Sequence, residues 1–142
     1  MYVIMREMND IFRCFAQFRT ERVAPLGLKS IHCGYITEVC EHPGVSQDSL
    51  SKRTYINKSN VARQLAFLEE NGFVLRKPSD KDKRILQVFP TEKAYEALPV
   101  IQRAQEEWEQ QLTEGFTDEQ KEALRAQLAD IKARAVRCLE AL

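Results

Sequence analysis

The chain has 142 residues, of which 44% are hydrophobic, so it is long enough for one domain with a buried core. No apolar run approaches the ~18–20 residues that cross a membrane, and the charged N-terminal segment does not resemble a signal peptide, so we expect a cytoplasmic protein. With two histidines, no CxxC pair and no glycine-rich phosphate loop, the sequence argues against an enzyme and predicts no cofactor and no metal site.

Charge is balanced in total but distributed unevenly along the chain. Basic and acidic side chains number 21 each. Residues 46–90 carry nine basic and five acidic side chains, whereas residues 91–142 carry seven and eleven. A locally basic region can face an anionic polymer such as nucleic acid. Charge alone leaves open the alternative that this excess is chance on solvated helix faces.

Apolar periodicity predicts two helices at the N-terminal end. The first covers residues 3–21 and ends before Pro25 and Gly27, which break helices. Its apolar face is formed by Met8, Ile11, Phe12, Phe15 and Phe18. The second helix covers residues 29–42, and the residues expected on its buried face are Ile31, Tyr35 and Val39.

Two shorter helices joined by a tight connection follow. Ser46 is the N-cap candidate for a helix over 47–53, because its hydroxyl can accept a hydrogen bond from the first turn. Residues 54–56 form the connection, and Asn57 is the N-cap candidate for a helix over 58–71. A short helix, a tight turn and a capped second helix are typical of a helix-turn-helix.

The exposed face of the helix over 58–71 is suited to reading DNA. Its core side is defined by helical spacing of Val61, Leu65 and Leu68. Ser59 and Arg63 then lie on the opposite face, with Asn60 beside them. Arg can fork onto guanine and Asn can pair with adenine in the major groove. Lys58 and Ser59 lie at the helix N-terminus, where backbone N–H groups favour phosphate.

A β-hairpin with a charged tip is predicted next. Apolar runs over 73–77 and 85–89 predict two strands, and residues 78–84 form the tip between them. Five consecutive charges of both signs, Asp80 to Arg84, lie in this tip. An ordinary solvated loop would also carry such charges, and the acidic pair Glu69-Glu70 counts against a DNA-binding surface.

Two long helices complete the chain. A helix from Thr91 to about residue 113 contains Pro99, which is expected to kink or reset it. Thr117 and Gln120 fit a capping box that opens a last helix over 118–140. One stripe of that helix is apolar: Leu124, Leu128, Ile131, Ala135 and Leu139. The predicted fold is mainly α with a small β-hairpin, a winged helix-turn-helix core whose flanking helices pair with a second subunit.

Residues 45–94, VSQDSLSKRTYINKSNVARQLAFLEENGFVLRKPSDKDKRILQVFPTEKA, resemble the winged-helix core of MarR-family transcriptional regulators. The most specific parts are LEENGFVLRKPSDKDKR and the following TEK. The acidic-x-Arg signature of the family's wing is matched by Asp82-Lys83-Arg84. The resemblance implies that Arg84 reaches the minor groove of DNA and that Asp82 braces it.

The resemblance also implies a homodimeric repressor that binds a pseudo-palindromic double-stranded DNA operator in the cytoplasm, associated with the nucleoid. Residues 1–27 and 95–142 would supply dimerisation helices, and residues 28–94 would form the DNA-binding lobe. The predicted DNA contacts come from the helix-turn-helix and the wing tip: Ser46, Gln47, Asn57, Lys58, Ser59, Asn60, Arg63, Gln64, Lys81, Asp82, Lys83 and Arg84.

A small aromatic effector that releases the operator is a further implication of the resemblance. The predicted effector-binding residues are Phe15, Phe18, Arg19, His32 and Tyr35, although helical spacing favours plain core positions for the two phenylalanines. Cys14 is a candidate oxidant-sensing thiol, so a redox-sensing regulator of the same fold stays open. A winged-helix module that binds protein and never touches DNA is the other alternative.

Overall fold

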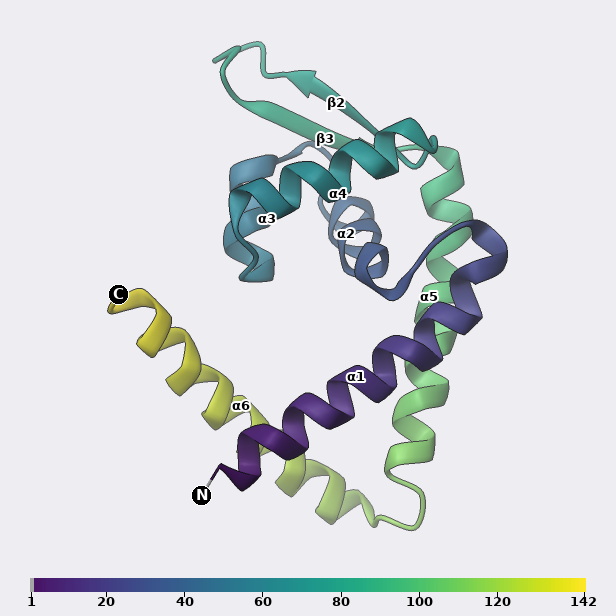
Figure 1. The fold of residues 1–142 in the computed structure, drawn as a ribbon, viewed down its shortest axis with the longest axis vertical. Coiled ribbons are helices and arrows are strands. Elements are labelled where there is room, and N and C mark those ends of the chain that lie inside the picture. The colour runs from purple at the N-terminus through teal and green to yellow at the C-terminus, as the bar shows by residue number, and fades with distance from the viewer. Residues whose placement is uncertain (1) are drawn as a thin grey trace. The chain divides into compact units, whose positions relative to one another are not determined.

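The computed structural model describes residues 2–142, which form helices and one small sheet (Figure 1). In chain order the elements are α1 (Val3–Val23), the 3-10 turn η1 (Ala24–Leu26), α2 (Ser30–Glu41), β1 (Val45–Ser46), α3 (Gln47–Thr54), α4 (Lys58–Glu70), β2 (Val74–Pro78), β3 (Leu86–Pro90), α5 (Glu92–Leu112) and α6 (Asp118–Glu140). The predicted class, mainly α around a winged helix-turn-helix, is confirmed. Within residues 2–142, no helix is long and apolar enough to cross a membrane.

Contacts divide the chain into two units, one that extends to Glu106 and one that covers Glu107–Leu142. The boundary falls inside α5, whereas the sequence predicted lobes of 28–94 and of 1–27 with 95–142. The lobes remain a prediction, because they concern the assembly of two subunits and the units reflect contacts within one.

Helix starts are set by local caps. The hydroxyl of Ser46 accepts a hydrogen bond from the first turn of α3 at 3.0 Å, and Asn57 Oδ1 accepts one from the N–H of Asn60 at 2.8 Å. At α6, Thr117 Oγ1 accepts from the N–H of Gln120 at 3.1 Å, and Gln120 Oε1 accepts from the N–H of Thr117 at 2.9 Å. These contacts confirm the three predicted N-caps and the predicted bounds of α6.

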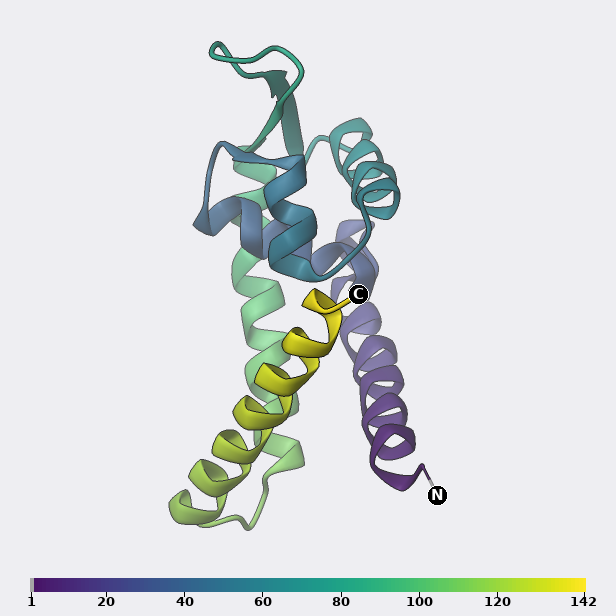
Figure 2. The ribbon, with the colours of Figure 1, turned by 90° about the vertical axis from the view of Figure 1, so that its left-hand side faces the viewer.

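The wing hairpin belongs to a three-stranded antiparallel sheet ordered β1-β3-β2. Arg76 of β2 lies opposite Val88 of β3, and on the other side of β3 Val45 of β1 pairs with the same residue. The sequence predicted the hairpin and missed β1, because two residues have no periodicity and this strand exists only through its pairing. Figure 2 shows the hairpin projecting past the helices of its own unit. The residue before α3, Ser46, pairs with Gln87 near the loop end of the hairpin.

The core of the first unit lies among α2, α3, α4 and the sheet. Val61, Leu65 and Leu68 of α4 are fully buried, as predicted. For α2 the prediction was partly wrong, because Ile31 is 50% exposed. The residues that α2 buries are Ser30, His32, Cys33, Tyr35, Ile36 and Val39. This helix is covered on more than one side, so its buried surface is wider than the single stripe that was assumed.

Polar contacts attach the end of α1 to α2. The N–H of Ser30 donates to Thr20 Oγ1 at 2.8 Å, and Arg19 Nε donates to Ser30 Oγ at 2.8 Å. Val23, at the last position of α1, is fully buried. Farther along, α5 continues through Pro99, so this residue does not reset the helix.

Candidate nucleic-acid interface

A closed turn fixes α4 relative to α3. Tyr55 follows α3 in the left-handed conformation, with φ 59° and ψ 31°, and this reverses the chain. Ser51 Oγ donates to the carbonyl of Ile56, and the N–H of Ile56 donates to the carbonyl of Ser51 at 3.3 Å. A left-handed tyrosine is disfavoured by about 1–2 kcal/mol, so the surrounding hydrogen bonds and the buried Leu50 hold the turn in place.

The solvent-facing side of α4 carries the predicted base-reading residues. Ser59 and Arg63 are exposed, and Asn60 between them is half-buried. Arg63 Nη1 donates to Asn60 Oδ1 at 3.1 Å, and Ser59 Oγ donates to Oδ1 of the cap residue Asn57 at 2.9 Å. The first two turns of α4 therefore present a hydroxyl, an amide and a guanidinium whose positions are set by hydrogen bonds within the helix.

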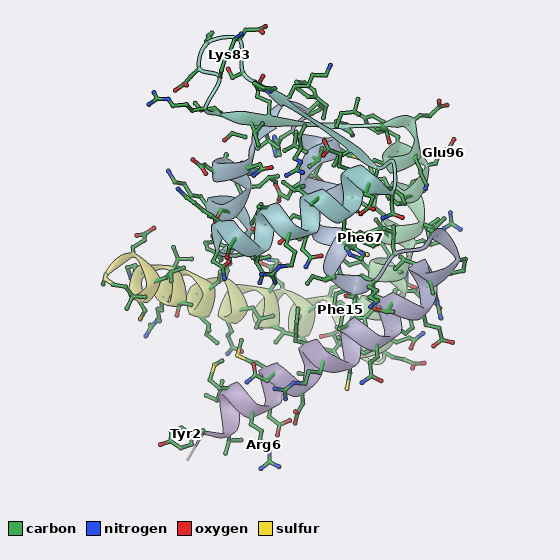
Figure 3. The ribbon with its side chains drawn as sticks, turned by 45° about the horizontal axis from the view of Figure 1, so that its top comes forward. Tyr2, Arg6, Phe15, Phe67, Lys83 and Glu96 are labelled. Carbon is green, nitrogen blue, oxygen red and sulfur yellow. The ribbon has the colours of Figure 1, made fainter. Side chains whose placement is uncertain are left out.

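The wing tip is a tight loop organised by Asp82. Its Oδ1 accepts from the N–H and from Nε of Arg84 at 3.0 Å each, and its Oδ2 accepts from Arg84 Nη2 at 3.0 Å. These hydrogen bonds lower the pKa of the Asp82 carboxyl and raise the pKa of Arg84. The Arg84 side chain is nevertheless 90% exposed, and Lys81 is exposed on the same loop. Lys83 is also exposed there, at the end of the hairpin (Figure 3). Asp82 therefore holds a guanidinium that still faces solvent.

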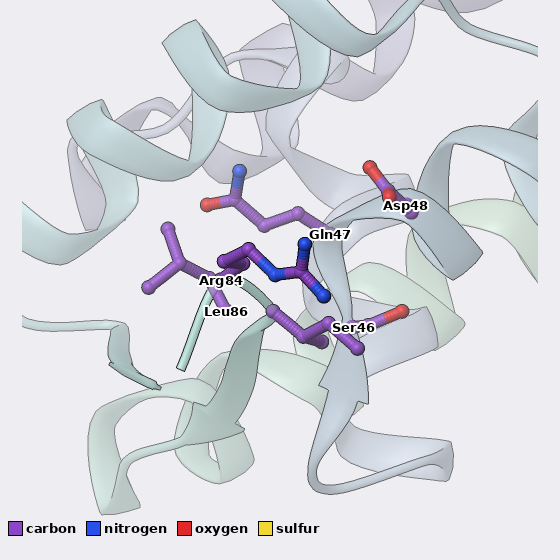
Figure 4. A pocket seen from close by; sticks show the side chains of 6 residues that line it. Ser46, Gln47, Asp48, Arg84 and Leu86 are labelled. Atoms are coloured by element: carbon purple, nitrogen blue, oxygen red, sulfur yellow. The ribbon is translucent and has the colours of Figure 1, made fainter. Parts of the chain in front are cut away.

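A shallow hollow of about 70 Å³ lies where the first turn of α3 meets the wing tip and the start of β3 (Figure 4). It is large enough for a few water molecules and far too small for an organic ligand. Across this hollow from Arg84, the carboxylate of Asp48 pairs with Lys58 Nζ at 3.6 Å. Its lining is Ser46, Gln47, Asp48, Arg84, Ile85 and Leu86, so predicted contacts from α3 and from the wing border one surface.

Arg76 is the residue of this region that sequence reasoning overlooked. Its Nη1 donates to Gln47 Oε1 at 2.9 Å, and its Nη2 donates to Glu69 Oε1 at 3.1 Å. Glu69 is therefore a paired carboxylate rather than a free charge, and the half-buried Gln47 side chain accepts a hydrogen bond from Arg76. Strand alternation was the available signal, because it places Arg76 on the same face of β2 as the buried Val74.

Comparison with known proteins agrees with this geometry. A sequence profile of the MarR family matches residues 35–86. The HTH-type transcriptional regulator YybA of Bacillus subtilis (strain 168) is 30% identical over 129 residues, which are 91% of this chain and 86% of YybA. The chain belongs to the MarR family.

Solved structures of MarR-family regulators have the same fold. The regulator from Methanosarcina mazei Go1 superposes with a TM-score of 0.91 at 25% identity, covering 97% of this chain and 99% of that one. A MarR-family regulator from Listeria monocytogenes, solved with a 26-mer DNA, gives 0.86 at 26% identity and covers 92% and 87% of the two chains. These proteins are transcriptional regulators, which confirms the expectation that this MarR-family member is not an enzyme.

The effector-binding residues predicted for this MarR-family chain lie on α1 and α2. The guanidinium of Arg19 lies 4.4 Å from the ring centroid of Phe15. The guanidinium of Arg22 lies over the ring of Phe18 at the same distance. Burial lowers the pKa of Arg19. Arg19 Nε bonds to the hydroxyl of Ser30, and no carboxylate within residues 2–142 forms an ion pair with Arg19. Tyr35 lies in the core, where burial raises its pKa.

His32 connects α2 to α4. Its Nδ1 accepts a hydrogen bond from the N–H of Lys29 at 2.9 Å, and its ring stacks on Phe67 of α4 with centroids 4.2 Å apart. Burial, together with the positive charge of Lys29, lowers the pKa of His32, and a hydrogen bond with the Gln64 side chain opposes the shift. His32 as an effector ligand and Gln64 as a DNA contact remain predictions, and the structure places these two side chains against each other.

The four cysteines differ in accessibility. Cys14 and Cys138 are exposed, Cys40 is half-buried and Cys33 is buried. Burial raises the pKa of Cys33 and of Cys40. Redox sensing by Cys14 remains a prediction. Within the part of the chain that the structure describes, no group of three or more His, Cys, Asp or Glu side chains could hold a metal ion.

Proposed function

We propose that this MarR-family protein is a homodimeric repressor that binds a pseudo-palindromic DNA operator and is released by a small aromatic carboxylate. Helix α4 would lie in the major groove of each half-site, and the wing would reach the adjacent minor groove. The DNA contacts would be the α3, α4 and wing-tip residues that the sequence analysis predicted.

The observation that carries the proposal is the wing tip beside a capped polar helix. Arg84 is oriented by Asp82 yet 90% exposed, as a cation must be to enter a narrow minor groove. Ser59 and Arg63 face solvent on α4, whose opposite side is fixed in the core. A free solvated loop would not need three hydrogen bonds to orient one arginine, so this arrangement favours binding over simple solubility.

Exposed apolar side chains support the dimer. In α6, Leu124, Leu128, Ile131 and Leu139 are between 38% and 50% exposed. In the first half of α1, Ile4, Ile11 and Phe12 are between 50% and 68% exposed. Apolar stripes of this length on helices are characteristic of surfaces that a partner covers.

Arg19 supports the effector. Its half-buried guanidinium lies on an aromatic ring and has no carboxylate partner within residues 2–142, so an organic anion would find both a charge and an apolar wall there. An aromatic acid such as benzoate combines the two features. This part of the proposal predicts that benzoate-class acids lower operator affinity of the wild type and not of Arg19→Gln.

Operator titration tests the proposal. Genomic fragments retained by the purified protein define an operator, and fluorescence anisotropy then measures affinity at several salt concentrations. The wild type should lose affinity linearly in log–log form as salt rises. Arg63→Ala and Arg84→Ala should each weaken binding about tenfold or more without unfolding the protein.

Arg125→Ala is the matched control, because this exposed arginine of α6 lies outside the winged helix and pairs with Glu122 at 2.6 Å. It removes the same charge and should leave operator affinity near the wild-type value. Full operator affinity in the Arg63→Ala, Arg84→Ala double variant would contradict the assigned contacts. Absence of any salt-dependent binding to duplex DNA would instead favour the protein-interaction alternative.

A further inference from the structure

Arg76 joins three segments that are far apart in the chain. It lies on β2, its Nη1 reaches Gln47 at the start of α3, and its Nε and Nη2 both reach Oε1 of Glu69 near the end of α4, at 3.3 and 3.1 Å. The second oxygen of that carboxylate, Oε2, accepts the backbone N–H of Arg76 at 3.0 Å. We call Gln47, Glu69 and Arg76 the Arg76 bridge.

At the Glu69 end of the Arg76 bridge, both carboxylate oxygens accept hydrogen bonds from Arg76. The Glu69 carboxylate binds the backbone and the side chain of one residue at once, so it fixes the strand and not only the guanidinium. Hydrogen bonds from Arg76 are the largest cause of the lowered pKa of Glu69. Only 20% of the Arg76 side chain is exposed, against 90% for Arg84. Arg76 is therefore mostly buried within the protein, whereas Arg84 is exposed to solvent.

The bridge spans the joint between helices and wing. β2 pairs along its whole length with β3, and the loop between these two strands carries Lys81, Lys83 and Arg84. A rotation of the hairpin on α4 would move these cations together. The bridge resists this rotation through its contacts with α4, and the pairing of β1 with β3 ties the same hairpin to the start of α3. Gln47 accepts a hydrogen bond from Arg76 and also lines the hollow that Arg84 borders. It therefore lies next to both arginines.

We propose that Arg76 and Glu69 are positioning residues for DNA binding, which hold the wing at a fixed angle to α3 and α4 before the operator arrives. The inference rests on the proposed function. Neither residue needs to touch DNA. A wing that is already oriented loses less conformational freedom on binding, and this is how preorganisation raises affinity.

The charge of Glu69 makes the test sharp, because two explanations predict opposite signs. If Glu69 is only an acidic group near DNA, Glu69→Gln should tighten binding by removing repulsion. If it positions the wing, Glu69→Gln should weaken operator binding by about tenfold, the effect of losing a charge-assisted hydrogen-bond network. Glu70→Gln is the matched control, since it removes one charge from the adjacent exposed residue of the same helix.

Arg76→Lys is the second variant, because it keeps the charge and loses the planar fork that reaches Gln47 and Glu69 together. Affinity and its salt dependence are measured by anisotropy, well below the melting temperature of each variant. We expect Glu69→Gln and Arg76→Lys to weaken binding and to reduce the salt slope, because a displaced wing withdraws cations from phosphate. A role in stability alone would lower the melting temperature and leave the slope unchanged.

The outcomes separate this inference from the proposed function. Wild-type protein that binds no duplex in a salt-dependent way overturns the proposed function itself. Wild-type binding with Glu69→Gln equal to or tighter than Glu70→Gln overturns the positioning role, as does wild-type affinity and slope in Arg76→Lys. Weaker binding and a smaller slope in both bridge variants, with Glu70→Gln unchanged or tighter, supports it.

Discussion

At the scale of single residues, the pair Asp82 and Arg84 shows how an acidic group can serve an anion-binding surface. Exposed ion pairs contribute little to folding stability, because solvent screens them and side-chain freedom is lost. Here the carboxylate also accepts the backbone N–H of Arg84, so it shapes the loop as well as the side chain. Its role is therefore better described as orientation of the guanidinium than as stabilisation.

We predict that Asp82→Ala weakens operator binding several-fold, even though it makes the protein more positive. Without the carboxylate, the Arg84 side chain samples many rotamers, and binding must select the one that enters the groove. Asp80→Ala removes a charge from an exposed position of the same loop and should leave affinity unchanged or higher. Anisotropy titrations of both variants at one salt concentration measure this difference, and tighter binding by Asp82→Ala would contradict the orienting role.

At the scale of elements, His32 connects α2 with α4, the helix that forms the candidate nucleic-acid interface. The ring is 4% exposed, caps α2 through Nδ1 and lies parallel to Phe67, with 3° between the planes. Accepting the Lys29 N–H requires Nδ1 to carry no proton. Protonation would therefore break the cap and place a second positive charge beside Lys29.

This geometry gives a pH dependence whose sign follows from the lowered pKa of His32. The unfolded chain binds a proton more readily than the folded one, so the contribution is fully present above the unfolded pKa of about 6.5 and is lost as pH falls below it. We predict that the free energy of unfolding drops between pH 8 and pH 5.5, as measured by chemical denaturation.

His32→Asn should reduce this pH dependence, because Asn Oδ1 can replace Nδ1 as an acceptor and does not titrate in this range. His42→Asn is the control, because it makes the same substitution at the exposed end of the same helix. If His32 is the responsible group, His32→Asn reduces the pH dependence more than His42→Asn does. An identical pH profile for the wild type and His32→Asn would show that His32 is not the responsible group.

The elements also show what the sequence could and could not predict. Ser46, Asn57 and Thr117 were predicted as caps because each acts within three residues of itself. The Arg76–Gln47 contact joins residues 29 positions apart, and β1 exists only by pairing with β3. Such contacts depend on how elements meet, and no local pattern encodes them. The prediction that Ile31 is buried was wrong for the same reason, because the fold as a whole determines which sides of α2 are covered.

At the scale of the whole molecule, α6 differs from the winged helix in the burial of its apolar side chains. The winged-helix region has a core of its own, from Val23 at the end of α1 to Ile101 on α5. In contrast, α6 has no buried residue, and its apolar stripe faces solvent in the single chain. A helix with that pattern is stable in water mainly through packing of its apolar face, which is the physical basis for expecting a second subunit.

We therefore predict that Leu128→Glu combined with Ile131→Glu converts a dimer into a monomer, as measured by sedimentation velocity. Both side chains lie on the stripe, and two carboxylates buried against a partner would be strongly disfavoured. Ala126→Glu with Ala133→Glu is the matched control, because at 100° per residue these exposed alanines lie on the opposite face of α6 and receive the same charge. The control should remain dimeric.

Operator affinity should fall by orders of magnitude only in the stripe variant, because a monomer binds one half-site and loses the effective concentration that links two half-sites. Dimers in both variants, or monomeric wild-type protein, would show that the stripe of α6 does not join the subunits.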